Sequence, residues 1–132
     1  ERRELVKGAP ITLADGRVVQ PEEVLGPLQR GCKLMMTGDC AETESLVKIA
    51  RDADAIVTEA TYLDADAELA RGYGHLTAGD AARFAREAGA RQLILTHISG
   101  RNSEKDIAEE ARGLFPNAIV ARDFDTFKIR GG

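Results

Sequence analysis

The chain has 132 residues, a length that suits one compact domain, and 43% of them are hydrophobic and 30% charged, as in soluble globular proteins. No apolar run approaches the roughly 18 residues that a membrane-spanning helix requires, so we expect no contact with a membrane. The formal net charge of −4 excludes a strongly basic nucleic-acid-binding domain, although RNA contact through a local patch stays open.

The cysteines and the first residues bear on where the protein works. Cys32 and Cys40 are too few for a disulfide framework, so we expect reduced thiols in a cytoplasmic protein. The sequence begins with Glu1 instead of Met and carries no signal peptide. We therefore expect it to be a piece of a longer protein.

The first thirty residues differ in pattern from the rest. Residues 11–19 form two short alternating runs around an Asp-Gly pair, which predicts a β-hairpin. Residues 21–25 predict one helical turn that begins at a proline. We expect a single domain over 1–132, in which residues 1–32 supply the hairpin and a connecting segment and residues 33–132 form the core.

From residue 33 onward, short apolar runs alternate with stretches of helical periodicity. Thr43, Thr77 and Ser103 are the predicted N-caps of three helices. Short strands that alternate with helices of about ten residues indicate βαβ units, whose strands are mostly parallel and buried on both faces. The predicted strands are 33–37, 55–58, 93–96, 118–121 and 126–129, and the predicted helices are 43–50, 77–89 and 103–115.

Polar residues stand at the places where such a sheet gathers ligands, beyond the carboxyl ends of its strands. Asp39 follows the first strand, Glu59 the second and His97 the third, and His75 precedes a helix. Each also has a plain structural explanation. Asp39 can cap a turn and Glu59 can be a solvated loop carboxylate. His75 can neighbour an N-cap, and His97 can be a core imidazole.

Together the four residues are stronger evidence for a site than any one of them, because the chain has only two histidines and both fall at this predicted edge. A carboxylate and an imidazole are suitable ligands for a cation such as Zn²⁺. A second Glu–His pair nearby would serve as a proton donor with its orienting partner. Two protein ligands do not make a zinc site, so the residues alone leave the structural explanations open.

Four short motifs follow one another along the chain, namely Thr37-Gly38-Asp39-Cys40, Thr58-Glu59-Ala60-Thr61-Tyr62, Gly74-His75-Leu76-Thr77 and Leu95-Thr96-His97-Ile98-Ser99. In their order and intervals they resemble the motifs of the ribonuclease Z family, which processes the 3′ ends of tRNA. With two matching stretches upstream, 13–19 and 24–27, the chain resembles the C-terminal half of that family over nearly its whole length. The resemblance implies an α/β architecture, namely the C-terminal half of a metallo-β-lactamase fold (an αββα sandwich) with a mixed sheet, βαβ units and an N-terminal β-hairpin.

The resemblance also implies a zinc-dependent endoribonuclease that removes the 3′ trailer from tRNA precursors by attack of metal-activated water. Asp39 would bridge two zinc ions, and His97 would be a ligand of one of them. His75, oriented by Glu59, would protonate the leaving 3′ oxygen of the RNA.

Three further residues are weaker candidates for binding the substrate phosphate, namely Thr77, Ser99 and Arg101. For Thr77 the role of a helix cap explains the residue equally well.

The chain departs from the family pattern at three positions. Cys40, Leu76 and Asn102 stand where the family usually has Thr, Ser and Tyr. A thiol is a poorer hydrogen-bond partner than a hydroxyl, so the support of the neighbouring Asp would differ. These departures concern substrate selection more than the type of reaction.

The family's His-x-His-x-Asp-His motif, which supplies most of the metal ligands, does not occur in these 132 residues. We therefore expect weak or absent zinc binding and no catalysis by this chain alone. Another metallo-β-lactamase-fold hydrolase, acting on phosphodiesters or esters, would share Asp39 and His97 without needing the Glu59–His75 pair. The third alternative is a non-catalytic half-fold module.

Half of such a sandwich would leave one face of its sheet without a partner. Such an apolar face normally finds one, so besides precursor tRNA we expect the missing N-terminal half or a homodimer as partner. A register error of one residue would exchange the faces of a strand. The candidates for the uncovered face are Leu34, Met36, Ile56, Ile94 and Ile119.

Overall fold

The computed structural model describes residues 2–27 and 29–132, so Glu1 and Leu28 of the predicted domain lie outside the described residues. The chain divides into two compact units, Glu1–Arg30 and Gly31–Gly132, close to the predicted boundary between residues 32 and 33. The candidate site residues all belong to the second unit.

The first unit contains the predicted hairpin. Ile11 pairs with Val19 in antiparallel register, and Gly16 takes a φ of 85° in the turn. The Asp15 carboxylate accepts a hydrogen bond from the backbone N–H of Arg17 at 3.0 Å, which closes the turn. The elements are α1 (Arg2–Val6), β1 (Ile11–Thr12), β2 (Val18–Val19) and α2 (Pro21–Val24), of which α1 was not predicted.

The second unit is built on a four-stranded sheet with the strand order β3-β4-β5-β6, in which all neighbouring strands are parallel. The strands are β3 (Leu34–Met36), β4 (Ala55–Glu59), β5 (Leu93–Thr96) and β6 (Ala118–Val120). The helices are α3 (Glu44–Ala50), the 3-10 turn η1 (Asp64–Asp66), α4 (Ala67–Tyr73), α5 (Ala78–Glu87) and α6 (Glu104–Leu114). The predicted βαβ alternation is confirmed.

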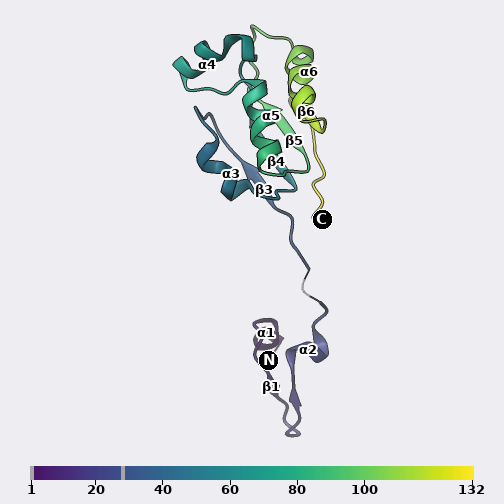
Figure 1. Cartoon of the computed structure of the whole chain (residues 1–132). Helices are drawn as coiled ribbons and strands as arrows, with labels where there is room; N and C mark the ends of the chain where they lie inside the picture. The colour runs from purple at the N-terminus through teal and green to yellow at the C-terminus, as the bar shows by residue number, and fades with distance from the viewer. Residues whose placement is uncertain (1, 28) are drawn as a thin grey trace. The chain divides into compact units, whose positions relative to one another are not determined.

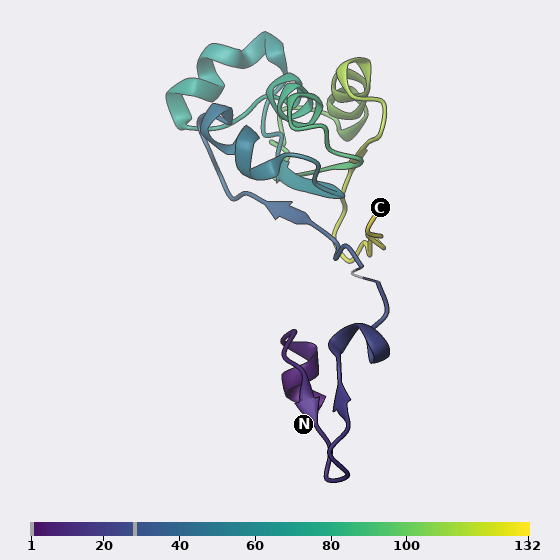
Figure 2. The same cartoon turned by 60° about the horizontal axis from the view of Figure 1, so that its bottom comes forward.

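The core lies between the sheet and the helices α3, α5 and α6, which cover one of its faces (Figures 1 and 2). Alanines dominate the buried face of α5, where Ala81, Ala82 and Ala85 have no exposed surface. These small side chains let α5 approach both the sheet and α6 closely. Phe84 and Ile107 are the largest buried side chains that the helices contribute.

Two of the three predicted N-caps act as caps. Thr77 forms a capping box with Asp80 at the start of α5, and the Ser103 hydroxyl accepts the N–H of Asp106 at 3.1 Å. Thr43 occupies the N-cap position of α3, but its side chain makes no capping hydrogen bond. Glu42 accepts the N–H of Ser45 instead, at 3.3 Å.

The predicted strand 126–129 does not form. Phe127 and Ile129 are half-buried and line the same shallow hollow as Leu34 and Met36. The alternation of apolar and polar residues in this segment therefore reflects packing of an extended tail on the sheet face, without ladder hydrogen bonds to β6. An alternating pattern does not distinguish these two situations.

Four of the five residues predicted for the uncovered face lie on the side of the sheet away from the helices, but one of the four, Ile94, is only 3% exposed. Leu34 and Met36 are 48% and 66% exposed, and the sheet register places Ile94 and Ile119 opposite one another on the same face. Ile56 pairs with Met35 and Leu93, so it points to the helices and is fully buried. The prediction for Ile56 was wrong by one residue of register, and its neighbour Val57 lies on the uncovered face.

Among the residues that the structure describes, no helix combines the length and the apolar character that crossing a membrane would require.

Candidate active site

Four side chains meet where the parallel strands end. Glu59 is the last residue of β4, His97 directly follows β5, and Asp39 follows β3. His75 lies in the connection between α4 and α5. The four residues selected from the sequence are therefore brought together, as expected for the carboxyl edge of a parallel sheet.

Glu59 is the buried centre of this cluster, and its side chain is only 2% exposed. One carboxylate oxygen accepts the backbone N–H of Cys40 at 2.8 Å. The other accepts the hydroxyl of Thr61. A buried carboxylate is costly unless it is hydrogen-bonded, and here donors from three segments meet that requirement. The alternative of a solvated loop carboxylate is thereby excluded.

His75 is the third partner of Glu59. Its Nδ1 lies 3.0 Å and 3.2 Å from the two carboxylate oxygens. Because a carboxylate only accepts hydrogen bonds, Nδ1 carries the proton, and Nε2 is the ring nitrogen left for other chemistry. The ring is 19% exposed and lies beside the ring of Tyr62, with 6.2 Å between centroids. The contact thus fixes the tautomer and the direction of the imidazole.

His97 and Asp39 form the more open part of the site. Their Nδ1 and Oδ1 atoms are 3.2 Å apart, and the side chains are 50% and 63% exposed. His97 takes a φ of 53°, in the left-handed region that few non-glycine residues adopt, so the chain turns sharply after β5. The exposure of its ring excludes the alternative of a core imidazole.

Thr61 links the two parts of the site. Its hydroxyl donates to Glu59 and lies 3.1 Å from Nδ1 of His97, so one side chain contacts both groups. Its carbonyl accepts the N–H of Ser99 at 3.0 Å, which ties the loop after β5 to the end of β4. Thr61 belongs to one of the four sequence motifs but was not predicted as a site residue, because a threonine after a strand has no distinctive pattern.

The arrangement suits a cation. Asp39, His75 and His97 each offer one ligand atom, and these atoms lie within 4.8 Å of one another. One carboxylate and two imidazoles are donors that zinc and similar divalent metals prefer. The residues therefore fit a metal ion, although three donors leave at least one coordination position to be filled from elsewhere.

Cys40 contributes to the site through its backbone. Burial raises the pKa of the Cys40 thiol above its ordinary value; the contact with Thr37 opposes that effect and the nearby Glu59 charge adds to it. The thiol therefore stays protonated at neutral pH. Its backbone N–H supports Glu59 irrespective of the side chain, which explains how a cysteine is tolerated here.

The three candidates for phosphate binding lie in different surroundings. Thr77 is fully buried, and its hydroxyl donates to Asp64 and accepts the N–H of Asp80 at 3.0 Å. Arg101 is exposed, and its backbone N–H donates to the hydroxyl of the half-buried Ser99 at 3.3 Å. Ser99 and Arg101 are thus accessible beside His97, whereas the Thr77 hydroxyl is engaged within the fold.

The two remaining departures from the family pattern differ in their surroundings. Leu76 is 2% exposed, so it packs in the interior next to His75. Asn102 has a buried side-chain nitrogen that makes no hydrogen bond to any residue that the structure describes.

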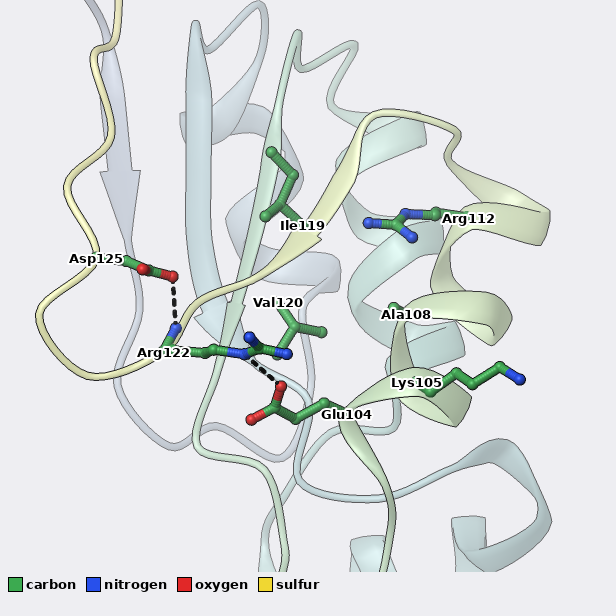
Figure 3. Close-up of a pocket in the computed structure, with 8 residues that line it drawn as sticks. All are labelled: Glu104, Lys105, Ala108, Arg112, Ile119, Val120, Arg122 and Asp125. Carbon is green, nitrogen blue, oxygen red and sulfur yellow. Dashed lines mark hydrogen bonds and ion pairs between the residues drawn. The ribbon is translucent and has the colours of Figure 1, made fainter.

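A separate hollow of about 370 Å³ lies between α6 and β6, and none of the four clustered site residues lines it (Figure 3). Its polar groups contact one another. Nε of Arg122 donates to Glu104 at 2.7 Å, and Nε of Arg112 donates to the carbonyl of Ala118 at 2.9 Å. The two arginines therefore hold α6 against β6 and the loop that follows.

Comparison with known proteins gives the same fold. Residues 4–98 match the model of the beta-lactamase superfamily domain. The chain is 51% identical over 124 residues to a ribonuclease Z of Bradyrhizobium diazoefficiens, a match that covers 94% of this chain and 41% of that relative. The chain thus spans about two fifths of the length of that relative.

Two solved structures resemble the chain. Human tRNase Z, short form, matches with a TM-score of 0.61 and 30% identity over 86% of this chain and 36% of that one. The metallo-beta-lactamase fold protein YhfI of Bacillus subtilis matches with a TM-score of 0.63 and 26% identity, over 67% of this chain and 36% of that one.

Proposed function

The chain belongs to the β-lactamase superfamily, and from this membership we propose that it is part of a metal-dependent endoribonuclease that removes 3′ trailers from tRNA precursors. The similarity to proteins named ribonuclease Z supports the choice of reaction. The single observation that carries the proposal is the buried Glu59 carboxylate that holds His75 beside Asp39 and His97.

His75 acts as the proton donor in this proposal. Glu59 holds Nδ1, so Nε2 is the nitrogen that faces a leaving oxygen. Imidazole is the side chain that most often serves as general acid in enzymes. Such general acid catalysis contributes about 10²- to 10⁴-fold to a rate.

Asp39 and His97 hold the metal in this proposal. Zinc is the preferred ion and two ions the preferred number; when bound, they would supply activated water and offset charge on the phosphodiester. The acidic and imidazole donors of this chain fit that role. Ser99 and Arg101 contact the phosphate, whereas we assign Thr77 the role of helix cap.

The cluster also favours a second function, because His75 lies within ligand distance of the same ion as Asp39 and His97. In that case His75 binds metal, and the protein is another hydrolase of the superfamily that acts on phosphodiesters or esters. A non-catalytic module is less well supported, since every polar residue expected in this half is present.

Partners and location follow from the proposed reaction. We propose precursor tRNA as substrate and the cytoplasm as location. We further propose that the chain works with a missing N-terminal half and as a homodimer. The share of the relatives that the chain spans supports a longer protein. By itself the chain should bind zinc weakly and leave a 3′-extended tRNA precursor uncut.

The test uses the full-length protein loaded with zinc and a 3′-extended tRNA precursor. We expect His75→Ala to reduce cleavage about 10²- to 10⁴-fold while zinc content is retained. Glu68→Ala, at an exposed position of α4, is the matched control and should leave cleavage unchanged. Loss of zinc together with activity would instead make His75 a metal ligand, and unchanged cleavage would refute the proposal.

A further inference from the structure

The segment between β4 and α5 carries His75, so what holds this segment decides where the imidazole lies. Its two ends are joined, because Tyr62 and Thr77 form an isolated parallel bridge. The N–H of Ala78 donates to the carbonyl of Tyr62 at 2.8 Å. Within the segment, the N–H of His75 donates to the carbonyl of Ala70 at 2.9 Å, which ties His75 to the end of α4.

An ion pair connects Asp64, near the start of this segment, to Arg83 of α5. The Arg83 guanidinium contacts both carboxylate oxygens of Asp64, at 3.0 Å and 3.1 Å. This bidentate geometry is the strong form of an arginine–carboxylate pair. Asp64 also accepts the hydroxyl of Thr77, two residues beyond His75. One carboxylate therefore contacts α5 and the residue that ends the His75 connection.

A second carboxylate, Glu110 of α6, binds the backbone of Asp64 and of the first turn of α5. One of its oxygens accepts the backbone N–H of Asp64 at 2.9 Å and that of Gly79 at 3.1 Å. Gly79 leaves room for the Asp64 side chain, because a β-carbon at position 79 would overlap the Asp64 carboxylate. Two framework helices thus fix Asp64 through its side chain and its backbone.

We propose that Asp64 and Arg83 are positioning residues for His75, an inference that rests on the proposed role of His75 as proton donor. Neither residue is among those that contact Glu59, Asp39 or His97 in the described part of the chain. They act through Thr77 and the bridge to Tyr62, which hold the connection that carries the imidazole. Removing the pair leaves the metal-binding residues in place and lets His75 move.

The test compares two substrates of the full-length zinc enzyme. A 3′-extended tRNA precursor has an alkoxide leaving group that needs a proton, whereas a nitrophenyl phosphodiester has a leaving group that departs without one. We expect Arg83→Met to lower kcat on the RNA about 10- to 100-fold, since a misplacement of about 1 Å can cost about 100-fold. KM for the RNA and cleavage of the nitrophenyl ester should stay within about twofold.

Two variants strengthen the test. Arg83→Lys keeps the charge but loses the bidentate contact, so it should recover part of the RNA cleavage. Gly79→Ala places a methyl group on α5 where the Asp64 carboxylate lies and so displaces that carboxylate. This variant should reproduce the loss of RNA cleavage expected for Arg83→Met. The matched control is Arg122→Met, which removes an arginine–carboxylate contact with Glu104 at the start of α6 and should leave the cleavage of both substrates unchanged (Figure 3).

The outcomes separate this inference from the proposed function. If Arg83→Met leaves RNA cleavage unchanged, or lowers the cleavage of both substrates alike, the positioning of His75 by this pair is refuted. If His75→Ala shows the loss confined to RNA but Arg83→Met does not, only the inference fails. If His75→Ala lowers the cleavage of both substrates alike, the proposed role of His75 as proton donor is refuted together with this inference.

Discussion

Glu59 is the residue on which the candidate site depends most. It ends β4 in the interior, and its carboxylate accepts hydrogen bonds from Cys40, Thr61 and His75. These donors come from three different segments of the chain, so the carboxylate fastens them to one another. The same residue thus contributes both to the stability of the fold and to the direction of the imidazole.

We expect Glu59→Gln to weaken both properties. The amide keeps the shape of the side chain but presents an NH₂ group to donors that need an acceptor. The free energy of unfolding should fall by about 1–3 kcal/mol, the cost of leaving a buried polar group unsatisfied. Cleavage of precursor RNA should fall about 10- to 100-fold, as is typical when a residue that orients a ligand or an acid is changed.

Urea denaturation and initial rates measure the two effects, with Glu87→Gln on the exposed end of α5 as control. A Glu59→Gln protein as stable and as active as the wild type would show that the hydrogen bonds at this carboxylate are dispensable.

The sequence could predict which residues meet at the site and that Glu59 contacts His75, but not the other contacts among them. Parallel strands end at one edge, so Asp39, Glu59 and His97 had to be neighbours. The contact of His97 with Thr61 depends on the left-handed turn after β5, which no residue pattern announces. The Asp64–Arg83 pair was missed for a similar reason, since α4 and η1 were not predicted.

At the scale of elements, the pair between η1 and α5 should make stability depend on pH. The Arg83 guanidinium beside Asp64 lowers the pKa of that carboxyl, and its burial only partly opposes this. A carboxyl with a lowered pKa contributes stability above its unfolded pKa, about 3.9, and this contribution is lost as the pH falls through the folded pKa. The contribution of Arg83 should therefore be full at neutral pH.

We expect the difference in melting temperature between the wild type and Arg83→Met to be largest near neutral pH and to shrink below about pH 4. Arg83 also contacts the Asp80 carboxylate at 2.7 Å, so the comparison reports the loss of both contacts of the guanidinium. Thermal unfolding followed by circular dichroism over a series of pH values measures it. A difference that is constant on acidification, or that grows, would contradict the assignment of the pair.

The elements themselves were largely predictable where local patterns and tertiary packing agree. Thr77 and Ser103 start helices as predicted, because each hydroxyl accepts a backbone N–H of its own helix. This contact is local and does not depend on the tertiary packing. The prediction of a strand at 126–129 was wrong. The alternation of apolar and polar residues shows which side chains are buried, whereas a strand also needs a neighbouring strand for its backbone hydrogen bonds. Ile56 failed because a run that is apolar on both sides has no alternation to mark its faces.

At the scale of the whole second unit, the helices bury one face of the sheet and the other face stays partly open. Met36 is 66% exposed there and Leu34 48%, and the tail residues Phe127 and Ile129 line the same hollow, of about 290 Å³. Contiguous apolar surface of this kind commonly marks an interface. The N-terminal half proposed above as a partner is the natural candidate to cover this face, and the matched relative is longer than the matched region.

In the isolated 132-residue chain this face should instead cause self-association. We expect sedimentation velocity to show dimers at high concentration, and Met36→Lys to shift the population toward monomers, because a charge on the face must lose its hydration when the face is buried. Ile49→Lys is the matched control, since Ile49 is equally apolar and 62% exposed but lies on α3. Monomers of the wild-type chain at high concentration would contradict the expectation. An equal effect of both substitutions would show that association, if present, does not use this face.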